Sequence, residues 1–257
     1  MQYLINGRQM VVDSYGAGAA LLLVHGLGGT ANSWFPVVAA FAGSRRVIVP
    51  DLPGAGRSGP NPDVSIDSLV TDLLGLLDAL DIPCAQVVGH SMGTVICQHL
   101  AARAPHRVLD LVLLGPLAEP PAAARPALRA RAAAALNQGL EGIADTVCER
   151  GLAATTRARQ PVVTGFVREL IVRQSPAGYA AHCLALAAAV KADPTLIQCR
   201  TLLLAGHEDT TSPPASVVEL AASLPQATHI ELADCGHWTA LEQPAAVVAA
   251  MQAFYAE

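Results

Sequence analysis

Six short apolar runs constrain the fold of this chain more than any other feature. They stand at residues 20–24, 46–50, 85–89, 108–114, 201–205 and 228–232. Continuous Val, Leu and Ile runs of this length are typical of strands buried on both faces of a parallel sheet. Between them lie helical patterns, such as the one from Ile66 to Leu80, where apolar residues recur at spacings of three and four. This alternation predicts an α/β fold with a mostly parallel twisted sheet flanked by helices.

Two segments depart from the alternation. At the N-terminus, QYLI and QMVVD flank Asn6-Gly7, which supplies the positive φ angles of a two-residue turn and predicts a hairpin. Residues 118–194 are alanine-rich and helical, without a convincing strand. We interpret them as a helical cap, or lid, inserted between strands of a core domain formed by residues 1–117 and 195–257. A longer run of ordinary packing helices is the alternative.

Composition and charge exclude several classes of function. The chain has 257 residues, of which 52% are hydrophobic and 14% charged, as in a globular protein rather than a disordered one. The net charge is −5 and the basic residues are scattered, so nucleic acid is not an expected partner. Lys191 is the single lysine, which leaves pyridoxal phosphate and P-loop chemistry almost without a candidate residue.

The chain also lacks signals for export or membrane insertion. The first sixteen residues contain no basic stretch followed by an apolar segment, and no apolar run approaches the roughly 18 residues that span a bilayer. We therefore expect a cytoplasmic protein without a membrane partner. The six cysteines form no C-x-x-C pair, so we predict neither a metal site nor a disulfide framework. The sequence does not indicate an oligomeric state.

The strongest local motif is VVGHSMGT at residues 87–94. It places G-x-S-x-G, from Gly89 to Gly93, after an apolar run and before a helical pattern. In this context the serine occupies a sharp strand-to-helix turn that exposes its hydroxyl at the edge of the sheet. We predict Ser91 as a nucleophile; a plain helix N-cap is the alternative.

A serine hydroxyl needs a base and an orienting carboxylate. His237, in the segment CGHW, follows the apolar run 228–232 and precedes the last helix, on a loop at the same edge as Ser91. Asp209, in GHEDTTSPP, follows the run 201–205, and Glu208 beside it is the alternative acid. The order Ser91, Asp209, His237 is the one expected of a catalytic triad on this kind of sheet.

Two glycine-rich stretches complete the candidate site. HGLGG at 25–29 follows a strand pattern, and we predict that the N–H groups of Leu27 and Met92 form an oxyanion hole, with an ordinary glycine-rich turn as the alternative. DLPGAGRSGP at 51–60 fits the spacing of a dinucleotide-binding turn. That fingerprint requires a helix directly after the glycines, whereas here the next helix begins only near Ser65, so we predict a loop on the rim of the site and no cofactor.

Taken together, HGLGG, DLPGAGRSG, GHSMG, GHEDTTSP and CGHW resemble the α/β-hydrolase superfamily along almost the whole chain. The resemblance implies a cofactor-free serine hydrolase with catalytic Ser91, Asp209 and His237. The segment RQSPAGYAAHCLAL is similar to 3-oxoadipate enol-lactonases, which implies a small ester or lactone as substrate. CGHW is also similar to the meta-cleavage-product C–C hydrolases, although those have Asn and Trp where this chain has His90 and Leu241.

Hydrolysis of an ester or lactone through an acyl-enzyme is therefore the predicted activity. C–C bond hydrolysis is the alternative, and a ligand receptor that keeps the hydrolase fold with little turnover is a third possibility. Trp34 and Trp238 are candidates for the wall of the pocket or for ordinary packing. Arg168 and Arg173 either meet a substrate carboxylate or are exposed helix charges.

Overall fold

One eight-stranded sheet forms the centre of the molecule, with the strand order β1-β2-β4-β3-β5-β6-β7-β8. The computed structural model describes residues 1–59, 61 and 63–256. The two pairs that contain β2 are antiparallel, and the pairs from β4 to β8 are parallel, which confirms the predicted mostly parallel sheet. The strands are β1 (Gln2–Ile5), β2 (Arg8–Tyr15), β3 (Ala19–Val24), β4 (Arg45–Asp51), β5 (Ala85–His90), β6 (Val108–Leu114), β7 (Arg200–Gly206) and β8 (Ala227–Leu232).

Local turn chemistry accounts for the N-terminal hairpin. Asn6 and Gly7 connect β1 to β2 with φ angles of 50° and 78°. Both angles lie in the left-handed region, which asparagine and glycine tolerate better than other residues. The predicted hairpin is confirmed.

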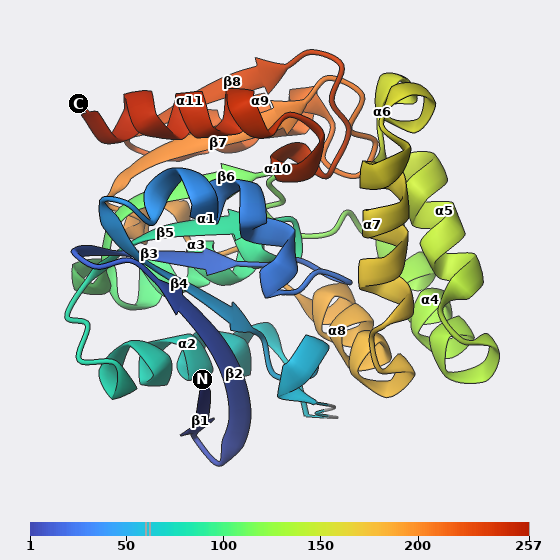
Figure 1. The fold of residues 1–257 in the computed structure, drawn as a ribbon, viewed down its shortest axis with the longest axis horizontal. Coiled ribbons are helices and arrows are strands. Elements are labelled where there is room, and N and C mark those ends of the chain that lie inside the picture. Colours follow the sequence, from blue (N-terminus) through green and yellow to red (C-terminus); the bar gives the residue numbers. More distant parts are fainter. Residues whose placement is uncertain (60, 62, 257) are drawn as a thin grey trace.

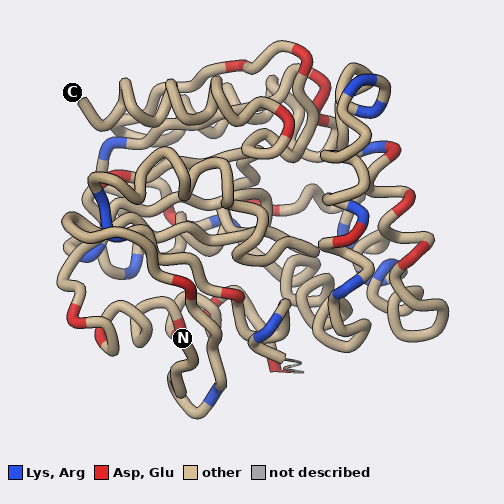
Figure 2. The backbone as a smooth tube through the Cα atoms, viewed as in Figure 1, with Lys and Arg blue, Asp and Glu red and all other residues tan. Residues whose placement is uncertain are grey.

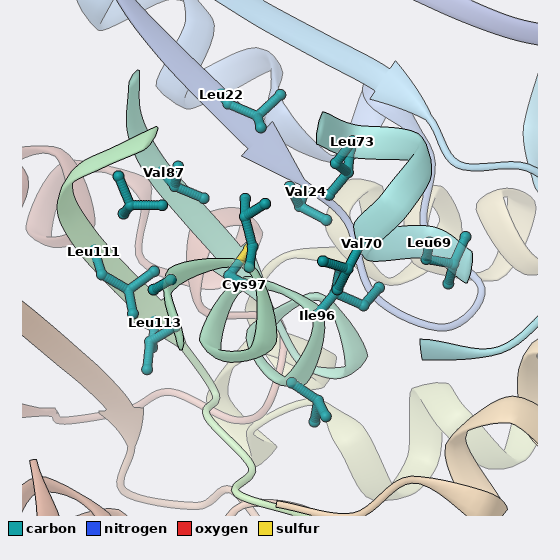
Figure 3. Close-up of a cluster of buried hydrophobic side chains, with 14 of the residues drawn as sticks. Leu22, Val24, Leu69, Val70, Leu73, Val87, Ile96, Cys97, Leu111 and Leu113 are labelled. Atoms are coloured by element: carbon teal, nitrogen blue, oxygen red, sulfur yellow. The ribbon is translucent and has the colours of Figure 1, made fainter. Parts of the chain in front are cut away.

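Helices cover both faces of the sheet (Figure 1). On one face lie α1 (Phe35–Phe41) and α11 (Pro244–Ala256); on the other lie α2 (Ile66–Ala79), α3 (Met92–Arg103) and α9 (Pro214–Ser223). Each face has its own core cluster: the first lies under α1 and α11, and the second under α2, α3 and α9. Successive strand residues point to opposite faces, so Leu21 and Leu23 belong to the first cluster, whereas Leu22 and Val24 belong to the second. Figure 3 shows part of the second cluster, where side chains of α2 and α3 meet those of β3, β5 and β6.

The last strand is an exception to the predicted burial on both faces. Thr228 through Glu231 of β8 are exposed, and Ile230 retains 40% of its accessible surface. β8 is the edge of the sheet, and within the described part of the chain it pairs with β7 alone. An edge strand leaves one flank open to solvent, so an apolar run does not by itself establish burial.

A separate layer of helices stands beyond the carboxyl ends of the parallel strands, on the right of Figure 1. It follows β6 in the chain and consists of α4 (Ala124–Gln138), α5 (Glu141–Gly151), α6 (Ala154–Arg159), α7 (Pro161–Val172) and α8 (Pro176–Ala188). We call α4 to α8 the helical layer. Much of its apolar interior forms a third core cluster, which includes Val167, Leu170 and Cys183. The division into a core domain and a cap domain of residues 118–194 stays a prediction.

Charged residues do not gather into one region of the molecule. Figure 2 shows basic and acidic positions interspersed along the backbone. In the described ranges, no helix combines the length and the apolar character that crossing a bilayer requires. The predictions about nucleic acid, membranes and a cytoplasmic location stay predictions.

Candidate active site

Ser91 occupies a strained turn between β5 and α3. Its φ of 53° lies in the left-handed region, which is uncommon for a residue other than glycine. The flanking glycines make the turn sterically possible, because a Cβ on Gly89 would lie 2.6 Å from the Gly93 oxygen and a Cβ on Gly93 would lie 2.3 Å from the Val24 oxygen. The G-x-S-x-G motif therefore forms the predicted strand-to-helix elbow.

The three predicted side chains meet at the carboxyl ends of the strands. His237 lies 2.7 Å from Ser91 through Nε2 and Oγ, and 2.7 Å from Asp209 through Nδ1 and Oδ2. They come from three loops, after β5, β7 and β8. All three are buried, so bulk water competes little for these hydrogen bonds.

The surroundings of Asp209 keep it ionised and set the tautomer of His237. Its Oδ1 accepts hydrogen bonds from the N–H groups of Thr211 and Ser212, both at 2.8 Å. Burial alone raises the pKa of Asp209, but interaction with His237 and the hydrogen bonds outweigh it, so that this pKa lies below its usual value. A carboxylate at this position accepts from His237 Nδ1–H, which leaves Nε2 free to accept the Ser91 hydroxyl proton.

The alternative acid, Glu208, lies elsewhere. Its Oε2 accepts a hydrogen bond from the N–H of Ala154 at 2.9 Å, at the start of α6. Asp209 thus contacts His237, and Glu208 contacts the helical layer. Consecutive residues of this loop point in different directions, so the carboxylate of Asp209 reaches His237 and that of Glu208 reaches the start of α6.

Glu242, which no sequence motif singles out, holds the loop that carries His237. It belongs to the short helix α10 (Thr239–Glu242) and is 2% exposed. Its Oε1 accepts from the N–H groups of Gly236 and Trp238, at 3.1 and 3.0 Å, on either side of the histidine. Burial raises the pKa of Glu242, although its hydrogen bonds oppose the effect. The residue was missed because a glutamate near a helix start usually faces solvent.

The same carboxylate also binds the helical layer. Its Oε2 accepts from the N–H of Ala153 and the hydroxyl of Thr156, both at 2.8 Å. The N–H of His237 itself donates to the oxygen of Gly151 at 2.7 Å. The histidine loop is therefore bonded directly to the segment that joins α5 to α6.

Two buried histidines near the site have structural partners. His90 is the last residue of β5, and its Nε2–H donates to the His237 oxygen at 2.8 Å. Burial, with repulsion from His237, lowers the pKa of His90 to about 3. His25 donates to the Gly26 oxygen and accepts from the Leu52 N–H, both at 2.9 Å. Both rings are therefore neutral and brace the loops around Ser91.

A cavity of about 120 Å³ opens above Ser91, and we call it the inner cavity. Its wall from the sheet side is formed by Leu27, His90, Ser91, Leu117, Thr211, His237 and Trp238. The opposite wall belongs to the helical layer and is formed by Leu128, Arg131, Thr146, Val147, Arg150, Gly151, Tyr179 and Leu186. Trp238 lines the cavity, whereas Trp34 is 1% exposed and packs in the core beside α1.

Of the two interpretations of Arg168 and Arg173, the structure favours exposed helix charges. Arg168 pairs with Asp145 at 2.7 Å, and Arg173 pairs with Glu169 at 3.3 Å, one turn earlier on α7. Neither lines the inner cavity. Among the described residues, Arg131 and Arg150 are the arginines that line the cavity.

The two predicted oxyanion donors lie beside the nucleophile in different ways. Leu27 lines the inner cavity, in a loop that passes close to Ser91: a Cβ on Gly26 would lie 2.7 Å from the Ser91 Cβ. Met92 is the first residue of α3, where an N–H has no acceptor within the helix. Their role as donors stays a prediction.

The glycine run that fits a dinucleotide turn packs against the helical layer. Gly54 and Gly56 have φ angles of 92° and 51°, and the next long helix begins at Ile66. A Cβ on Gly178 of α8 would lie 2.0 Å from the Gly54 oxygen, and His182 of α8 donates to the Pro53 oxygen at 2.8 Å. The loop thus seats a helix. Pro60, the last residue of the run, lies outside the described residues.

Comparison with known proteins identifies the family. The model of the alpha/beta hydrolase fold family matches residues 19–244. A 3-oxoadipate enol-lactonase from Acinetobacter baylyi is 32% identical over 91% of this chain and 87% of its own length. A 2-hydroxymuconate semialdehyde hydrolase from Pseudomonas sp. is 33% identical over 94% of this chain and 88% of its own length.

Other matches are structural or partial. The enol-lactonase from Burkholderia xenovorans has a TM-score of 0.95 at 30% identity, with both chains fully covered. A thermophilic esterase from Thermogutta terrifontis has a TM-score of 0.94 at 28% identity, covering 99% of this chain and 97% of the esterase. An acetyltransferase component of an acetoin cleaving system from Pseudomonas putida is 45% identical over 98 residues, 38% of this chain and 26% of that protein.

Family model, full-length relatives and solved structures thus agree with the resemblance inferred from the motifs. The relatives act on different bonds, so they establish the family and the hydrolase class rather than one substrate. This chain belongs to the α/β-hydrolase fold family.

Proposed function

We propose that this protein is a serine hydrolase that cleaves a carboxylic ester or a lactone through an acyl-enzyme. The observation that carries the proposal is the hydrogen-bonded line from Asp209 through His237 to Ser91, with both distances at 2.7 Å. Nucleophile and base within hydrogen-bond reach, with the base oriented by a third group, are the signature of an activated serine. The chemistry needs no cofactor.

In the proposed mechanism, His237 Nε2 takes the proton of Ser91 as Oγ attacks the substrate carbonyl. Asp209 stabilises the imidazolium that forms and remains ionised itself, in keeping with its lowered pKa. The imidazolium then protonates the leaving alcohol, and an acyl-serine remains. Water attacks this acyl group, with His237 again as the base, and releases the carboxylic acid.

The main-chain N–H groups of Leu27 and Met92 are the proposed oxyanion donors. Leu27 is supported by its place on the inner cavity and Met92 by its place at the start of α3. Each donor of this kind contributes on the order of 10²–10³ in rate in other hydrolases. Both are backbone groups, so the strained elbow and the glycine-rich loop are what position them.

The enol-lactonase and esterase relatives support an ester or lactone as substrate. The relative that is 33% identical and named as a semialdehyde hydrolase supports the second candidate, cleavage of a C–C bond next to a carbonyl. Both reactions begin at a carbonyl carbon and differ in the leaving group. Parallel assays on lactones, aryl esters and C–C diketones separate the two.

The proposal is tested with Ser91→Ala and 4-nitrophenyl acetate. We expect loss of activity on the order of 10⁴-fold or more, with unchanged circular dichroism, because the nucleophile is removed from a buried site that otherwise stays intact. Full activity in this variant would sink the assignment. Release of 4-nitrophenol beyond one equivalent per wild-type chain distinguishes an enzyme from a receptor that stalls after one acylation.

A further inference from the structure

A buried glutamine joins the helical layer to two loops of the sheet side. Gln174 lies between α7 and α8 and is 6% exposed. Its Oε1 accepts a hydrogen bond from the N–H of Gly56 at 2.9 Å. Its Nε2 donates to the oxygen of Leu170 at 3.0 Å and, at the longer distances of 3.4 and 3.3 Å, to the oxygens of Gly28 and Gly29. The amide thus contacts its own helix, the glycine run and the HGLGG loop.

The hydrogen-bonding groups of this amide are all engaged. The two hydrogens of Nε2 face three carbonyl oxygens, so one hydrogen is shared between two acceptors. Burying a carboxamide is favourable only when its donors and its acceptor are paired. The contacts of Gln174 therefore fix the side chain and the two loops relative to one another.

The part of the HGLGG loop that Gln174 contacts is a tight turn. The N–H of Gly29 donates to the oxygen of Gly26 at 3.0 Å, and Gly28 has a φ of 77°, so Leu27 and Gly28 are the two central residues. The N–H of the first central residue takes no part in the bond that closes such a turn. Among the residues that the structure describes, none accepts from the N–H of Leu27. This N–H is therefore available to a substrate oxygen.

Hydrogen bonds hold the turn from both walls of the inner cavity. From the sheet side, His25 Nδ1–H donates to the oxygen of Gly26 at 2.9 Å. From the helical layer, Gln174 donates to the oxygens of Gly28 and Gly29. The peptide groups before and after Leu27 are thus each bonded to a side chain outside the turn.

Apolar contacts also touch the turn, but they do not orient it. A Cβ on Gly28 would lie 3.0 Å from Ile171 Cγ1 and 3.3 Å from Tyr179 Cε2, so α7 and α8 pack closely against the loop. Apolar contact limits how near a peptide group can come, whereas a hydrogen bond to its oxygen also sets the direction of the group. On the side of the helical layer, Gln174 supplies this directional restraint.

We infer that Gln174 is a positioning residue, which directs the Leu27 N–H at the oxyanion by holding the oxygens of Gly28 and Gly29. The inference rests on the proposed function, in which Leu27 is an oxyanion donor. A donor aimed at the developing charge acts more strongly on the transition state than on the bound substrate. The helical layer then contributes to the rate of the chemical step as well as covering the site.

The first test is Gln174→Met, which keeps the length of the side chain and removes its hydrogen bonds. We expect kcat for 4-nitrophenyl acetate to fall on the order of 10-fold, with KM changed by about twofold or less. The loss is smaller than the 10²–10³ that accompanies removal of a donor, because the Leu27 N–H is misdirected rather than lost. The midpoint of the pH profile should stay that of wild type, since the bonds of His237 are untouched.

Inhibition by 1,1,1-trifluoro-2-butanone separates this role from a merely structural one. Ser91 Oγ adds to the carbonyl carbon, the Ser91 proton passes to His237, and the carbonyl oxygen becomes an oxyanion with no leaving group to depart. The inhibition constant should therefore rise in Gln174→Met by the same factor as kcat falls. A structural role alone would lower the melting temperature and leave the inhibition constant at its wild-type value.

Two further variants locate the effect. Gln174→Glu keeps an acceptor for the Gly56 N–H but loses the N–H donors, so its kcat should fall at least as far as in Gln174→Met. Gln86 is also a buried glutamine and donates to Asp110 at 2.8 Å, but it lies near the start of β5, at the opposite end from Ser91. Gln86→Met should therefore keep kcat within about twofold of wild type.

The outcomes that contradict the inference are distinct. Wild-type kcat in both Gln174 variants would overturn it, and so would a lower kcat with an unchanged inhibition constant. Wild-type kcat in Gln174→Glu alone would assign the effect to Gly56, and an equal loss in Gln86→Met would assign it to general destabilisation; either result also overturns it. Turnover that survives in Ser91→Ala would instead refute the proposed function.

Discussion

The two walls of the inner cavity are built in different ways. The wall from the sheet side consists of strand-end loops held by main-chain bonds and positive φ angles, as at Ser91 and Gly28. The opposite wall consists of side chains projecting from helices that form their own apolar cluster. A few polar contacts, including those of Glu242 and His182, join the two.

We expect the wall from the sheet side to determine the chemistry and the wall from the helical layer to determine which substrate binds. Backbone geometry at the ends of parallel strands brings the candidate triad together and leaves little freedom to residues such as Gly89 and Gly93. Helix surfaces, in contrast, can carry many side chains without a change of fold. We therefore expect substitutions on the sheet side to affect mainly kcat and substitutions on the helical side to affect mainly KM. Substitutions of the residues that join the two walls should disturb the packing of both.

The largest effect at the junction is expected for Glu242→Gln. A glutamine has one acceptor oxygen and turns an NH₂ group toward buried donors, so at least two N–H or O–H groups lose their partner. Each loss costs about 1–3 kcal/mol of stability. Because the loop that carries His237 is then less well held, we expect kcat to fall on the order of 10²-fold with a smaller change in KM. Steady-state kinetics with 4-nitrophenyl acetate and thermal unfolding measure the two effects.

Glu208→Gln is the matched control. Its side chain accepts one hydrogen bond, from Ala154, and none from the residues beside His237. We expect kcat of this variant to stay within a few-fold of wild type. Equal losses of kcat in the two variants would contradict a specific role for Glu242 in holding the histidine.

The second effect is a pH dependence of stability that originates at His182. Burial lowers the pKa of His182 to about 4, against 6.5 in its unperturbed state. Between pH 4 and 6.5 the unfolded chain therefore binds a proton at His182 that the folded chain does not bind. The free energy of unfolding that is present above pH 6.5 is thus reduced as the pH falls toward 4. At about 1.4 kcal/mol per unit, His182 contributes about 3 kcal/mol to this loss.

His182→Gln tests this dependence. Glutamine can still donate to the Pro53 oxygen and does not titrate, so the difference in unfolding free energy between wild type and variant should change by about 3 kcal/mol between pH 6.5 and 4. Denaturant unfolding at several pH values measures it. His99→Gln is the comparison, since His99 also bonds a main-chain oxygen, that of Val190, but is less buried. A pH-independent difference for His182→Gln would refute the assignment.

The smallest effect concerns how closely α8 approaches the glycine run. In Gly178→Ala the new methyl group would lie 2.0 Å from the Gly54 oxygen, so the helix must move, at a cost of about 1–3 kcal/mol. In Gly165→Ala, on α7, the methyl group meets nothing within 4 Å, and we expect a gain of about 0.5–1 kcal/mol. Opposite shifts in melting temperature are the expected outcome; shifts of the same sign would contradict close packing at Gly54.

Much of the fold was predictable because its signals are local. Each of the six apolar runs is a strand, and the Asn6-Gly7 turn and the elbow at Ser91 follow from backbone restrictions of the residues present. Burial was less predictable. The run 228–232 looks like the others, yet its place at the edge of the sheet leaves it exposed. Strand order is a long-range property that a single run does not carry.

In the candidate site, too, the features with local signals were predictable and those that depend on long-range contacts were not. The sequence alone placed Ser91, Asp209 and His237 after strands whose ends converge, because parallel strands deliver their loops to one edge. It left Glu208 open beside Asp209, considered Arg168 and Arg173 but not Arg131 as arginines near the site, and contained no sign of Glu242. These three outcomes depend on where loops and helices from distant parts of the chain meet. Spacing along a strand or helix is a local property, whereas the direction of a side chain relative to another element is decided only by tertiary packing.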